Sequence, residues 1–375
     1  MTEARLQDIY RPNHDEAARQ RFVGLLKTFA NGELEAQLER RYEQALLPAY
    51  RAAHGGSTPQ DRAAARPLFE SDALYQLWGA MVYCSQNLMW EAVGATCRRL
   101  QPAIEARAAR ASAAAGTELR LQSDLVPPEP IRSVEIHRQP GGYFAARRPD
   151  DLHAALLYVG SVELYRNAKG LTTAAAMGEP GIGRFIAANV RRHFPDLQPR
   201  RILDLGCGPG LETAAFNEQF PQAEVHGLDL SAPFVRFAHA WCADRGTPIH
   251  ARQADAQRTG YPDRHFDLIV SHILLHETWH DVMPNIFREA YRILAPGGAM
   301  LHADVPYQPQ RLSITKQVTN DWQVRNNGEP FWTGFADTDV PALLRAAGFD
   351  DVLATYEPLG SGCYYLFGGR RPRSS

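Results

Sequence analysis

The sequence is poor in cysteine, has no excess of charge of either sign and contains no long apolar run. Its five cysteines are scattered through 375 residues without a Cys-x-x-Cys spacing, which predicts no disulfide framework, no metal site and a reducing, cytoplasmic location. The 40 Lys and Arg residues against 42 Asp and Glu leave a net charge of −2, so we expect neither nucleic acid nor a membrane surface as a partner. No apolar run approaches the roughly 20 residues that cross a bilayer.

The composition is that of a globular protein, 45% hydrophobic and 22% charged, and its first 125 residues carry a helical pattern. Apolar residues recur at helical spacing, first at Phe22, Leu25, Leu26 and Phe29 and later at Leu74, Leu77, Trp78 and Met81. We therefore predict an all-helical N-terminal cap domain over residues 1–125. Its apolar stripes suit packing on the chain's own core and suit a homodimer interface equally well.

Residues 126–170 are predicted to form a connector. It begins with the proline-rich run 126–130, which is typical of a hinge. A β-hairpin is expected over 131–145, turning at Pro140-Gly141-Gly142, and a helix is expected from about 150 to 167.

Residues 171–375 are predicted to form an α/β domain, because strand and helix patterns alternate from residue 200 onward. The expected strands are 201–205, 223–230, 248–255, 266–273, 299–305, 352–357 and 363–367. The run Ala295-Pro296-Gly297-Gly298 is expected to end a helix and turn the chain into the fifth strand. The long segment 306–338 holds Tyr307, Trp322, Phe331 and Trp332, and we predict that it forms a lid insertion. Ordinary core packing of these aromatic residues is the alternative.

The most informative stretch runs from Arg201 to Gly210, where an apolar strand ends in a glycine-rich turn that opens a helix. Glycines at such a turn let the backbone bend sharply and let a ligand approach closely. The spacing is GxGxG, whereas a dinucleotide fingerprint reads GxGxxG. Asp204 just before the turn would repel a pyrophosphate and suits a ligand with a cationic end.

Two further carboxylates follow at strand ends. Asp229 closes the second strand, 25 residues after Asp204, where a carboxylate can accept hydrogen bonds from ribose hydroxyls. Asp255-Ala256 closes the third strand, where a carboxylate can accept a hydrogen bond from the exocyclic amine of an adenine. Because open α/β sheets bind ligands at the carboxyl ends of their strands, we expect all three carboxylates to face one crevice.

With these motifs the sequence resembles the class I S-adenosylmethionine-dependent methyltransferases over roughly residues 170–370. The motifs that carry the resemblance are 203–210, 227–231, Asp255-Ala256, 266–270 and 292–298. The resemblance implies a Rossmann-like, seven-stranded sheet with an antiparallel last strand, and S-adenosyl-L-methionine as the cofactor. It places Asp204 and Gly206 near the methionine part of the cofactor, Asp229 on the ribose and Asp255 at the adenine. The other expected cofactor contacts are Cys207, Gly208, Gly210, Leu230, Ala256 and Ser271.

The candidate catalytic residues follow the fourth strand. The segment 273–279 looks like the His-Asp-Trp segment of some small-molecule O-methyltransferases, whose histidine deprotonates the acceptor, and it makes His276 the expected general base. Glu277 stands where that pattern has Asp, and one residue separates it from Trp279. A structural role for His276 is the alternative. His272 is a further candidate, which can also shape the cofactor pocket through its backbone.

The helix before the sheet offers three more candidates. Arg166 is expected to hold the cofactor carboxylate, and Tyr158 and Tyr165 to face the sulfonium through cation–π contacts. Ordinary helix packing of the tyrosines is the alternative.

Three functions are compatible with these features. The first is a methyltransferase acting on a small molecule, with the helical domain and the 306–338 segment covering the acceptor site. The second keeps the cofactor but closes its methionine chain on itself and releases methylthioadenosine, as the azetidine-2-carboxylate synthases do. The third is a module that binds the cofactor without turnover.

Overall fold

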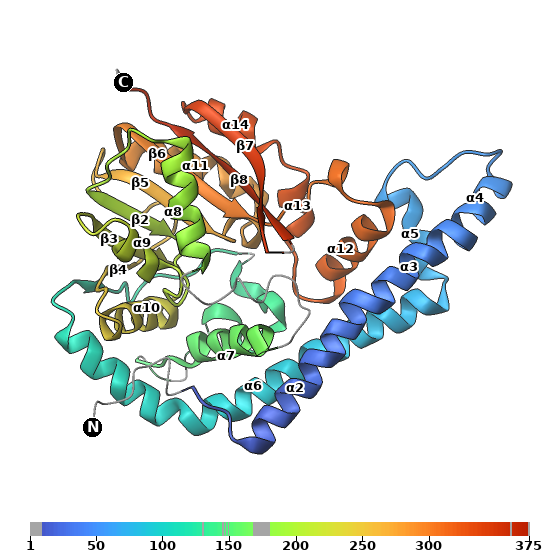
Figure 1. The fold of residues 1–375 in the computed structure, drawn as a ribbon, viewed down its shortest axis with the longest axis horizontal. Coiled ribbons are helices and arrows are strands. Elements are labelled where there is room, and N and C mark those ends of the chain that lie inside the picture. Colours follow the sequence, from blue (N-terminus) through green and yellow to red (C-terminus); the bar gives the residue numbers. More distant parts are fainter. Residues whose placement is uncertain are drawn as a thin grey trace.

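The computed structural model describes residues 10–129, 131–144, 146, 148, 150–167, 181–360 and 362–373. Figure 1 shows a twisted sheet with helices on both faces and a long helical layer along one side. Among the described residues, no helix combines the length and the apolar character that a bilayer crossing requires. All five cysteines are free.

One mixed sheet forms the centre of the C-terminal part. Its strands are β1 (Leu119–Arg120), β2 (Arg201–Leu205), β3 (Glu224–Asp229), β4 (His250–Gln253), β5 (Phe266–His272), β6 (Leu294–Asp304), β7 (Asp350–Leu359) and β8 (Gly362–Arg370). The strand order is β1-β4-β3-β2-β5-β6-β8-β7, and β8 runs antiparallel to both neighbours. The predicted Rossmann-like sheet is confirmed, with an eighth strand added because the two-residue β1 pairs in parallel with the edge strand β4.

Strand β6 begins earlier than the sequence predicts. Leu294 already pairs with Phe266, and the ladder then shifts until Leu268 pairs with Ala299. The run 295–298 is therefore a bulge inside the strand rather than a break before it. Gly297, at φ +80°, provides the left-handed turn of this bulge.

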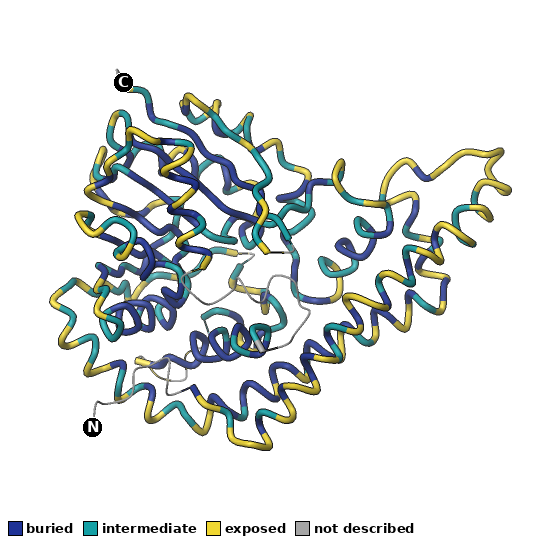
Figure 2. The backbone as a smooth tube through the Cα atoms, in the orientation of Figure 1, coloured by how far each residue is buried: buried dark blue, intermediate teal, exposed yellow. Residues whose placement is uncertain are grey.

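Alternate residues of the strands feed two cores. Ile202 packs with α8 (Gly181–His193), α9 (Thr213–Gln219) and α10 (Ala232–Asp244), whereas Leu203 packs with α11 (Met283–Ile293) and α14 (Val340–Ala346). The strands are buried on both faces, as a parallel sheet requires (Figure 2).

The N-terminal part is helical, as predicted. Helical segments follow one another without a break from α2 (His14–Thr28) through η1 (Phe29–Leu34), α3 (Glu35–Arg41) and η2 (Tyr42–Leu46) to α4 (Leu47–Ala53). A capping box of Asn13 and Glu16 starts α2. After α5 (Arg62–Glu70), the 42-residue α6 (Ala73–Ala114) runs back along α2. Lys27 donates to Gln86 at 2.5 Å, and Gln20 to Thr96 at 2.9 Å, so the two helices are antiparallel.

The predicted hairpin over 131–145 is wrong. The described residues form three 3₁₀ turns, η3 (Ile131–Ser133), η4 (Ile136–Arg138) and η5 (Gly142–Phe144). His137 and Arg138 both have left-handed backbone angles, φ 53° and 56°, which no β-strand can adopt. The expected helix follows as α7 (His153–Asn167). Part of the boundary region, 168–180, lies outside the described residues, and the division at 125 and 170 stays a prediction.

The 306–338 segment is largely helical. It contains η8 (Pro309–Arg311), α12 (Ile314–Asn326) and α13 (Trp332–Ala336). Helix α12 packs on the N-terminal helices: the Trp322 and Trp78 ring centroids lie 5.1 Å apart, and Lys316 Nζ donates to Glu35 at 2.7 Å. The segment thereby joins the N-terminal helices to the carboxyl end of β6.

Candidate active site

A cavity of about 940 Å³, mouth included, opens at the carboxyl ends of the parallel strands. Its floor consists of residues at the ends of β2, β3 and β5 and after β4, among them Gly206, Asp229 and Asp255. The connector contributes Tyr143 to the wall, and α7 contributes Tyr158. The expected contacts Gly208, Leu230, Ala256, His272 and Glu277 also line this cavity. The structure thus brings most of the predicted site residues together.

The glycine turn after β2 is shaped by three left-handed residues. Gly206, Gly208 and Gly210 have φ +73°, +53° and +78°. A Cβ on Gly206 would lie 2.5 Å from Leu274 Cδ1, and one on Gly210 would lie 2.9 Å from Ala238. A Cβ on Gly208 would meet nothing within 4 Å, so this glycine leaves an open backbone face for a ligand.

Asp229 is fixed by backbone donors. Its carboxylate accepts the Gly208 N–H at 2.9 Å and the Ser231 N–H at 2.8 Å. Burial raises the pKa of this carboxyl to about 6, although the backbone donors act in the opposite direction. Asp255 accepts the Gln257 N–H at 2.8 Å. Each carboxylate retains oxygen lone pairs for a ligand.

Besides Arg166 of α7, four predicted cofactor contacts do not line the cavity: Asp204, Cys207, Gly210 and Ser271. Asp204 is buried and accepts the Thr213 hydroxyl at 2.5 Å, and burial raises its pKa to about 7. The Cys207 thiol would lie 3.0 Å from a Cβ on Gly227. The Ser271 hydroxyl is bonded to His302 in the core. These side chains support the strand ends from behind, so their contacts with a ligand stay predictions.

A chain of acidic and imidazole side chains borders the cavity. His276 Nδ1 lies 2.5 Å from Asp304 Oδ1, and His276 Nε2 lies 3.5 Å from Glu277 Oε1. The same Glu277 oxygen is 2.8 Å from His137 Nε2, and His137 Nδ1 is hydrogen-bonded to the Glu329 carboxylate. Because each imidazole nitrogen of His137 faces a different carboxylate, the cluster is a hydrogen-bonded chain in this arrangement. The predicted absence of a metal stays a prediction, since His137, Glu277 and Glu329 place donor atoms within 4.8 Å of one another.

The charges in this chain follow from burial and pairing. Burial alone would lower the pKa of His276, but the Asp304 carboxylate and then Glu277 outweigh it and raise this pKa to about 10. For His137, burial is likewise outweighed by Glu329 and Glu277, and its pKa lies well above its usual value. Burial opposes ionisation of Glu277, yet the two histidines lower its pKa. At neutral pH Glu277 is therefore a carboxylate held between two imidazolium rings.

His137 is held in its strained conformation from both sides of its backbone. Its N–H donates to the Gly328 carbonyl at 2.7 Å, and its own carbonyl accepts from Trp90 Nε1 at 2.8 Å and Gln86 Nε2 at 2.6 Å. A Cβ on Gly328 would lie 2.5 Å from the backbone nitrogen of Arg138. Helix α6, the connector and the 306–338 segment thus fix one imidazole beside the cavity. Strained backbone of this kind is concentrated at functional sites.

Aromatic rings cover the cavity. The Tyr143 and Phe234 ring centroids are 5.2 Å apart, and those of Tyr158 and Phe234 are 5.4 Å apart. Ser231 anchors this wall by donating to the Tyr143 carbonyl at 2.6 Å. Tyr158 therefore lies where the sequence predicts, beside the cavity.

Two predicted residues of α7 point elsewhere. Tyr165 faces Lys27, whose Nζ lies 5.3 Å from the ring centroid, and Arg166 pairs with Glu163 at 2.7 Å. Neither lines the cavity, because they lie about two turns further along α7 than Tyr158. The catalytic role of Tyr165 and the carboxylate-binding role of Arg166 stay predictions without support from this geometry.

His272 lies at the end of β5 with its ring in the cavity wall. Burial lowers its pKa to about 4, so the ring is neutral at pH 7. Its Nε2 atom is buried and has no hydrogen-bond partner among the described residues. The next residue, Ile273, has φ 45°, which is unfavourable for a β-branched side chain. The chain therefore bends sharply where β5 meets the cavity.

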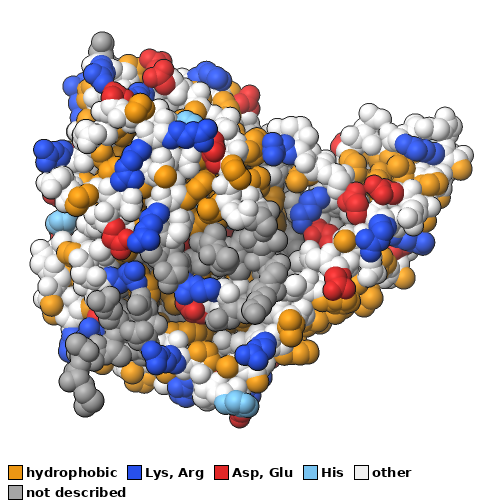
Figure 3. All heavy atoms as spheres, viewed as in Figure 1, with side chains coloured by type: hydrophobic (Ala, Val, Ile, Leu, Met, Phe, Trp, Pro, Cys, Tyr) orange, Lys and Arg blue, Asp and Glu red, His pale blue; other side chains and the backbone are white. Residues whose placement is uncertain are grey.

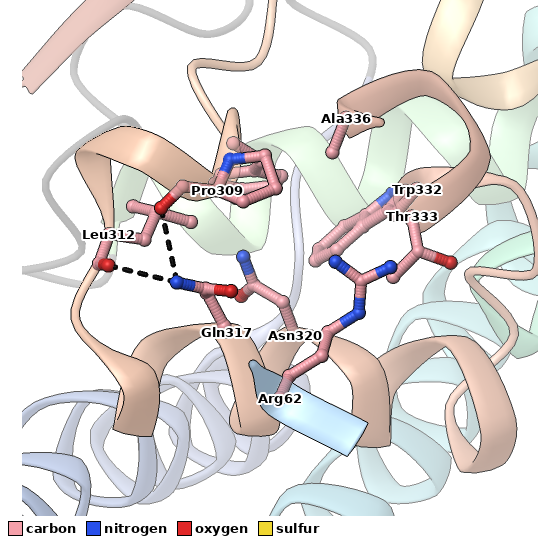
Figure 4. A pocket seen from close by; sticks show the side chains of 9 residues that line it. Arg62, Pro309, Leu312, Gln317, Asn320, Trp332, Thr333 and Ala336 are labelled. Carbon is pink, nitrogen blue, oxygen red and sulfur yellow. Dashed lines mark hydrogen bonds between the residues drawn. The ribbon is translucent and has the colours of Figure 1, made fainter. Parts of the chain in front are cut away.

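A second hollow of about 260 Å³, mouth included, lies between α5, α12 and α13 (Figure 4). The Gln317 amide is engaged by the carbonyls of Pro309 and Leu312, each at 3.1 Å. This volume is below the roughly 300–1,000 Å³ of typical ligand pockets. The larger cavity is therefore the candidate active site.

Sequence reasoning missed four residues of the hydrogen-bonded cluster and of the aromatic cavity wall: His137, Tyr143, Asp304 and Glu329. None belongs to a motif with fixed spacing, and they reach the site only through the tertiary fold. The available signals were weak: Asp304 is the last but one residue of the fifth predicted strand, and Glu329 belongs to the predicted lid.

Residues 202–298 match the family model described as a methyltransferase domain. These residues form a methyltransferase domain, which agrees with the predicted class I, S-adenosylmethionine-dependent superfamily. It is 35% identical over 117 residues to a malonyl-acyl-carrier protein O-methyltransferase of Halorhodospira halophila, covering 28% of this chain and 35% of that protein. It is 37% identical over 171 residues to a trans-aconitate 2-methyltransferase of Methylobacterium radiotolerans, covering 45% of this chain and 61% of that protein.

A third relative is phosphoethanolamine N-methyltransferase 3 of Arabidopsis thaliana, 32% identical over 164 residues, covering 42% of this chain and 31% of that protein. The chain thus spans between about a third and three fifths of the length of these relatives. The methyltransferase domain is the part that the family model matches, and the model does not extend to the N-terminal helices or the 306–338 segment.

Proposed function

We propose that this protein binds S-adenosylmethionine in the cavity at the strand ends and transfers its methyl group to a small molecule. The observation that carries the proposal is a glycine turn with an open backbone face beside the Asp229 carboxylate, in the wall of one large cavity. A cytoplasmic location, predicted from the cysteines, belongs to the same proposal.

The residues present fit this cofactor. Gly208 leaves room for the cofactor to approach the backbone closely. Asp229 can accept hydrogen bonds from the ribose hydroxyls, and Asp255 can accept one from the adenine amine. The faces of Tyr143 and Tyr158 suit a sulfonium, at about 0.5–2 kcal/mol for each cation–π contact. When bound, the sulfonium supplies an activated methyl group, and the protein then has to align the acceptor and exclude water.

Glu277 is the group that we assign to the acceptor. It lines the cavity, and its carboxylate can accept a hydrogen bond from the attacking N–H or O–H. His276 was the expected base, but a pKa of about 10 keeps its ring protonated at neutral pH, so its role here is to orient Glu277. Among the described lining residues none is Lys or Arg, which favours an amine or neutral acceptor over an anion.

A Glu277→Gln variant tests this assignment. Turnover should fall about 10²–10⁴-fold, because a carboxylate acceptor is lost, while S-adenosylmethionine affinity by calorimetry stays unchanged. The matched control is Asp281→Asn, an exposed acid of the same segment, which should keep full activity. Full activity of Glu277→Gln would remove the assignment.

Cyclisation of the cofactor's own methionine chain is the second candidate. The aromatic wall of Tyr143, Tyr158 and Phe234 favours it, because a curled aliphatic chain needs a closed, aromatic-lined space. In that reaction the amine nitrogen bonds to the γ-carbon, the carbon–sulfur bond breaks, and methylthioadenosine leaves with the electron pair. Before the attack the ammonium of the methionine chain must lose a proton, which Glu277 in the cavity wall can accept.

The deciding experiment incubates the protein with S-adenosylmethionine alone and then with panels of amines and phenols, followed by mass spectrometry. S-Adenosylhomocysteine that forms only with an added acceptor supports methyl transfer. Methylthioadenosine and a cyclic amino acid formed without an acceptor support cyclisation. Tight binding without either product would contradict both.

A further inference from the structure

The outer face of the α2–α6 layer is apolar although it faces solvent. On α2 and the two segments after it, the exposed residues Ala18, Phe22, Leu25, Phe29, Gly32 and Ala36 form one stripe. Phe22 is 61% exposed and Leu25 is 59% exposed, and Figure 3 shows hydrophobic side chains along this edge of the molecule. Figure 2 shows the same helices exposed on this side.

Helix α6 carries a second stripe beside the first. Its members are Leu77, Met81, Cys84, Leu88, Glu91 and Ala95, of which Leu77 is 50% exposed and Leu88 is 37% exposed. The inward faces of both helices are already used, since Val23 and Met89 are buried in the shared core. Of the apolar stripe members, Met81 packs against the core of the N-terminal helices, whereas Phe22, Leu25, Phe29, Leu77 and Leu88 stay exposed.

In sequence both stripes alternate between steps of four and three residues, the spacing of a coiled-coil seam, and the first stripe passes through the π-helical segment η1 at Phe29 and Gly32. Such a seam can meet an antiparallel copy of itself about its midpoint. Lys27 lies midway between Leu25 and Phe29, and Gln86 lies midway between Cys84 and Leu88. Lys27 and Gln86 are hydrogen-bonded to each other, so the two midpoints lie at the same level. A single two-fold axis at that level brings both stripes into register at once.

We propose that this face binds a second copy of the same chain, forming an antiparallel four-helix layer from α2 and α6 of each copy. In this register Leu25 meets Phe29 of the second copy, and Phe22 meets Gly32 of the second copy, so a large side chain lies opposite a small one. The exposed Arg21 meets Glu33 of the second copy, and the symmetry makes this ion pair twice. This self-complementarity in size and charge along the α2 stripe supports another copy as the partner, independently of the proposed catalytic function.

The test is the oligomeric state of the full chain by sedimentation velocity at micromolar concentration. We expect a dimer, with Leu25→Asp raising the dissociation constant about 100-fold or more, since a buried apolar anchor is replaced by a charge. The matched control is Val126→Asp, which changes an equally exposed residue (64%) outside the stripes and should leave the dimer intact. Circular dichroism checks that each variant is folded. A wild-type monomer, or a Leu25→Asp dimer as tight as the wild type, would overturn the proposal.

A charge reversal tests the register. Arg21→Glu should weaken the dimer about tenfold, and adding Glu33→Arg should restore it, because the two residues meet across the axis. Restoration by Glu91→Arg in place of Glu33→Arg would contradict this register, since it would pair α2 with α6 of the second copy.

Discussion

Two glycines of the turn after β2 share a left-handed backbone but differ in what surrounds them. A side chain at either position costs about 1–2 kcal/mol in backbone strain. At Gly206 the new Cβ would also collide with Leu274, whereas at Gly208 it would enter the cavity. We therefore expect Gly206→Ala to lower the free energy of unfolding by about 1–3 kcal/mol more than Gly208→Ala does.

The Gly206→Ala and Gly208→Ala variants also distinguish an effect on folding stability from an effect on S-adenosylmethionine binding. Gly208→Ala should weaken S-adenosylmethionine binding more than it weakens the fold, because its methyl group occupies the ligand's space. Denaturant unfolding and calorimetry on both variants measure the two effects. Equal unfolding losses would show that Leu274 moves aside.

His276 makes stability depend on pH in a known direction. Its pKa is raised from about 6.5 to about 10 in the folded protein, so its contribution is complete below pH 6.5 and is lost as the pH rises toward 10. The unfolding free energy of the wild type relative to His276→Gln should therefore fall over this range, with a slope approaching 1.4 kcal/mol per pH unit. Urea titrations at several pH values test this, and a constant difference would mean that the Asp304 pair does not hold the proton.

At the scale of elements, the contact between α6 and α12 decides how the 306–338 segment docks. Glycine inside a helix costs about 1 kcal/mol relative to alanine, yet a Cβ on Gly79 would lie 2.9 Å from Trp322 Nε1. Gly79→Ala should thus destabilise the wild type by about 1–3 kcal/mol. In a Trp322→Ala background the same substitution should stabilise the protein by about 1 kcal/mol. The four thermal unfolding curves form a double-mutant cycle. If Gly79→Ala destabilised the protein in both backgrounds, this docking of Trp322 on Gly79 would be contradicted.

The elements that the sequence predicted well are those with a strong local signal. Strands β2, β3 and β5 are apolar runs bounded by turn residues, and the glycine turn is set by residues adjacent in the chain. Asp229 at the end of β3 and Asp255 just after β4 reached the cavity as expected. Asp204 did not, because its direction depends on Thr213 in the next helix.

The connector could not be predicted in this way. His137 adopts its conformation because Trp90, Gln86 and the Gly328 backbone bind it, and these groups are up to 191 residues away in sequence. A hairpin was the best local solution for the connector, and the tertiary contacts overrode it. The site residues at the strand ends are therefore predictable from the sequence, whereas those that the connector and the helices bring to the cavity are not.

At the scale of the molecule, one apolar core runs through both parts of the chain. Met89, Val93 and Cys97 of α6 belong to the same buried cluster as Ile202 of β2 and Phe234 of α10. We expect a single cooperative unfolding transition, in which tryptophan fluorescence and far-ultraviolet circular dichroism coincide. Two separated transitions would show instead that residues 1–125 form an independent domain.

The shared core has a consequence for synthesis on the ribosome. Helix α6 is complete at Ala114, whereas α10, against which it packs, begins at Ala232. At about 5–20 residues per second, the part of α6 that packs on α10 waits on the order of ten seconds for this helix, whereas α2 is already made and α7 follows earlier. During that interval the nascent chain displays apolar residues on both faces of a 42-residue helix. We therefore expect the emerging protein to bind chaperones, and we expect its yield on expression to depend on translation speed between residues 115 and 244.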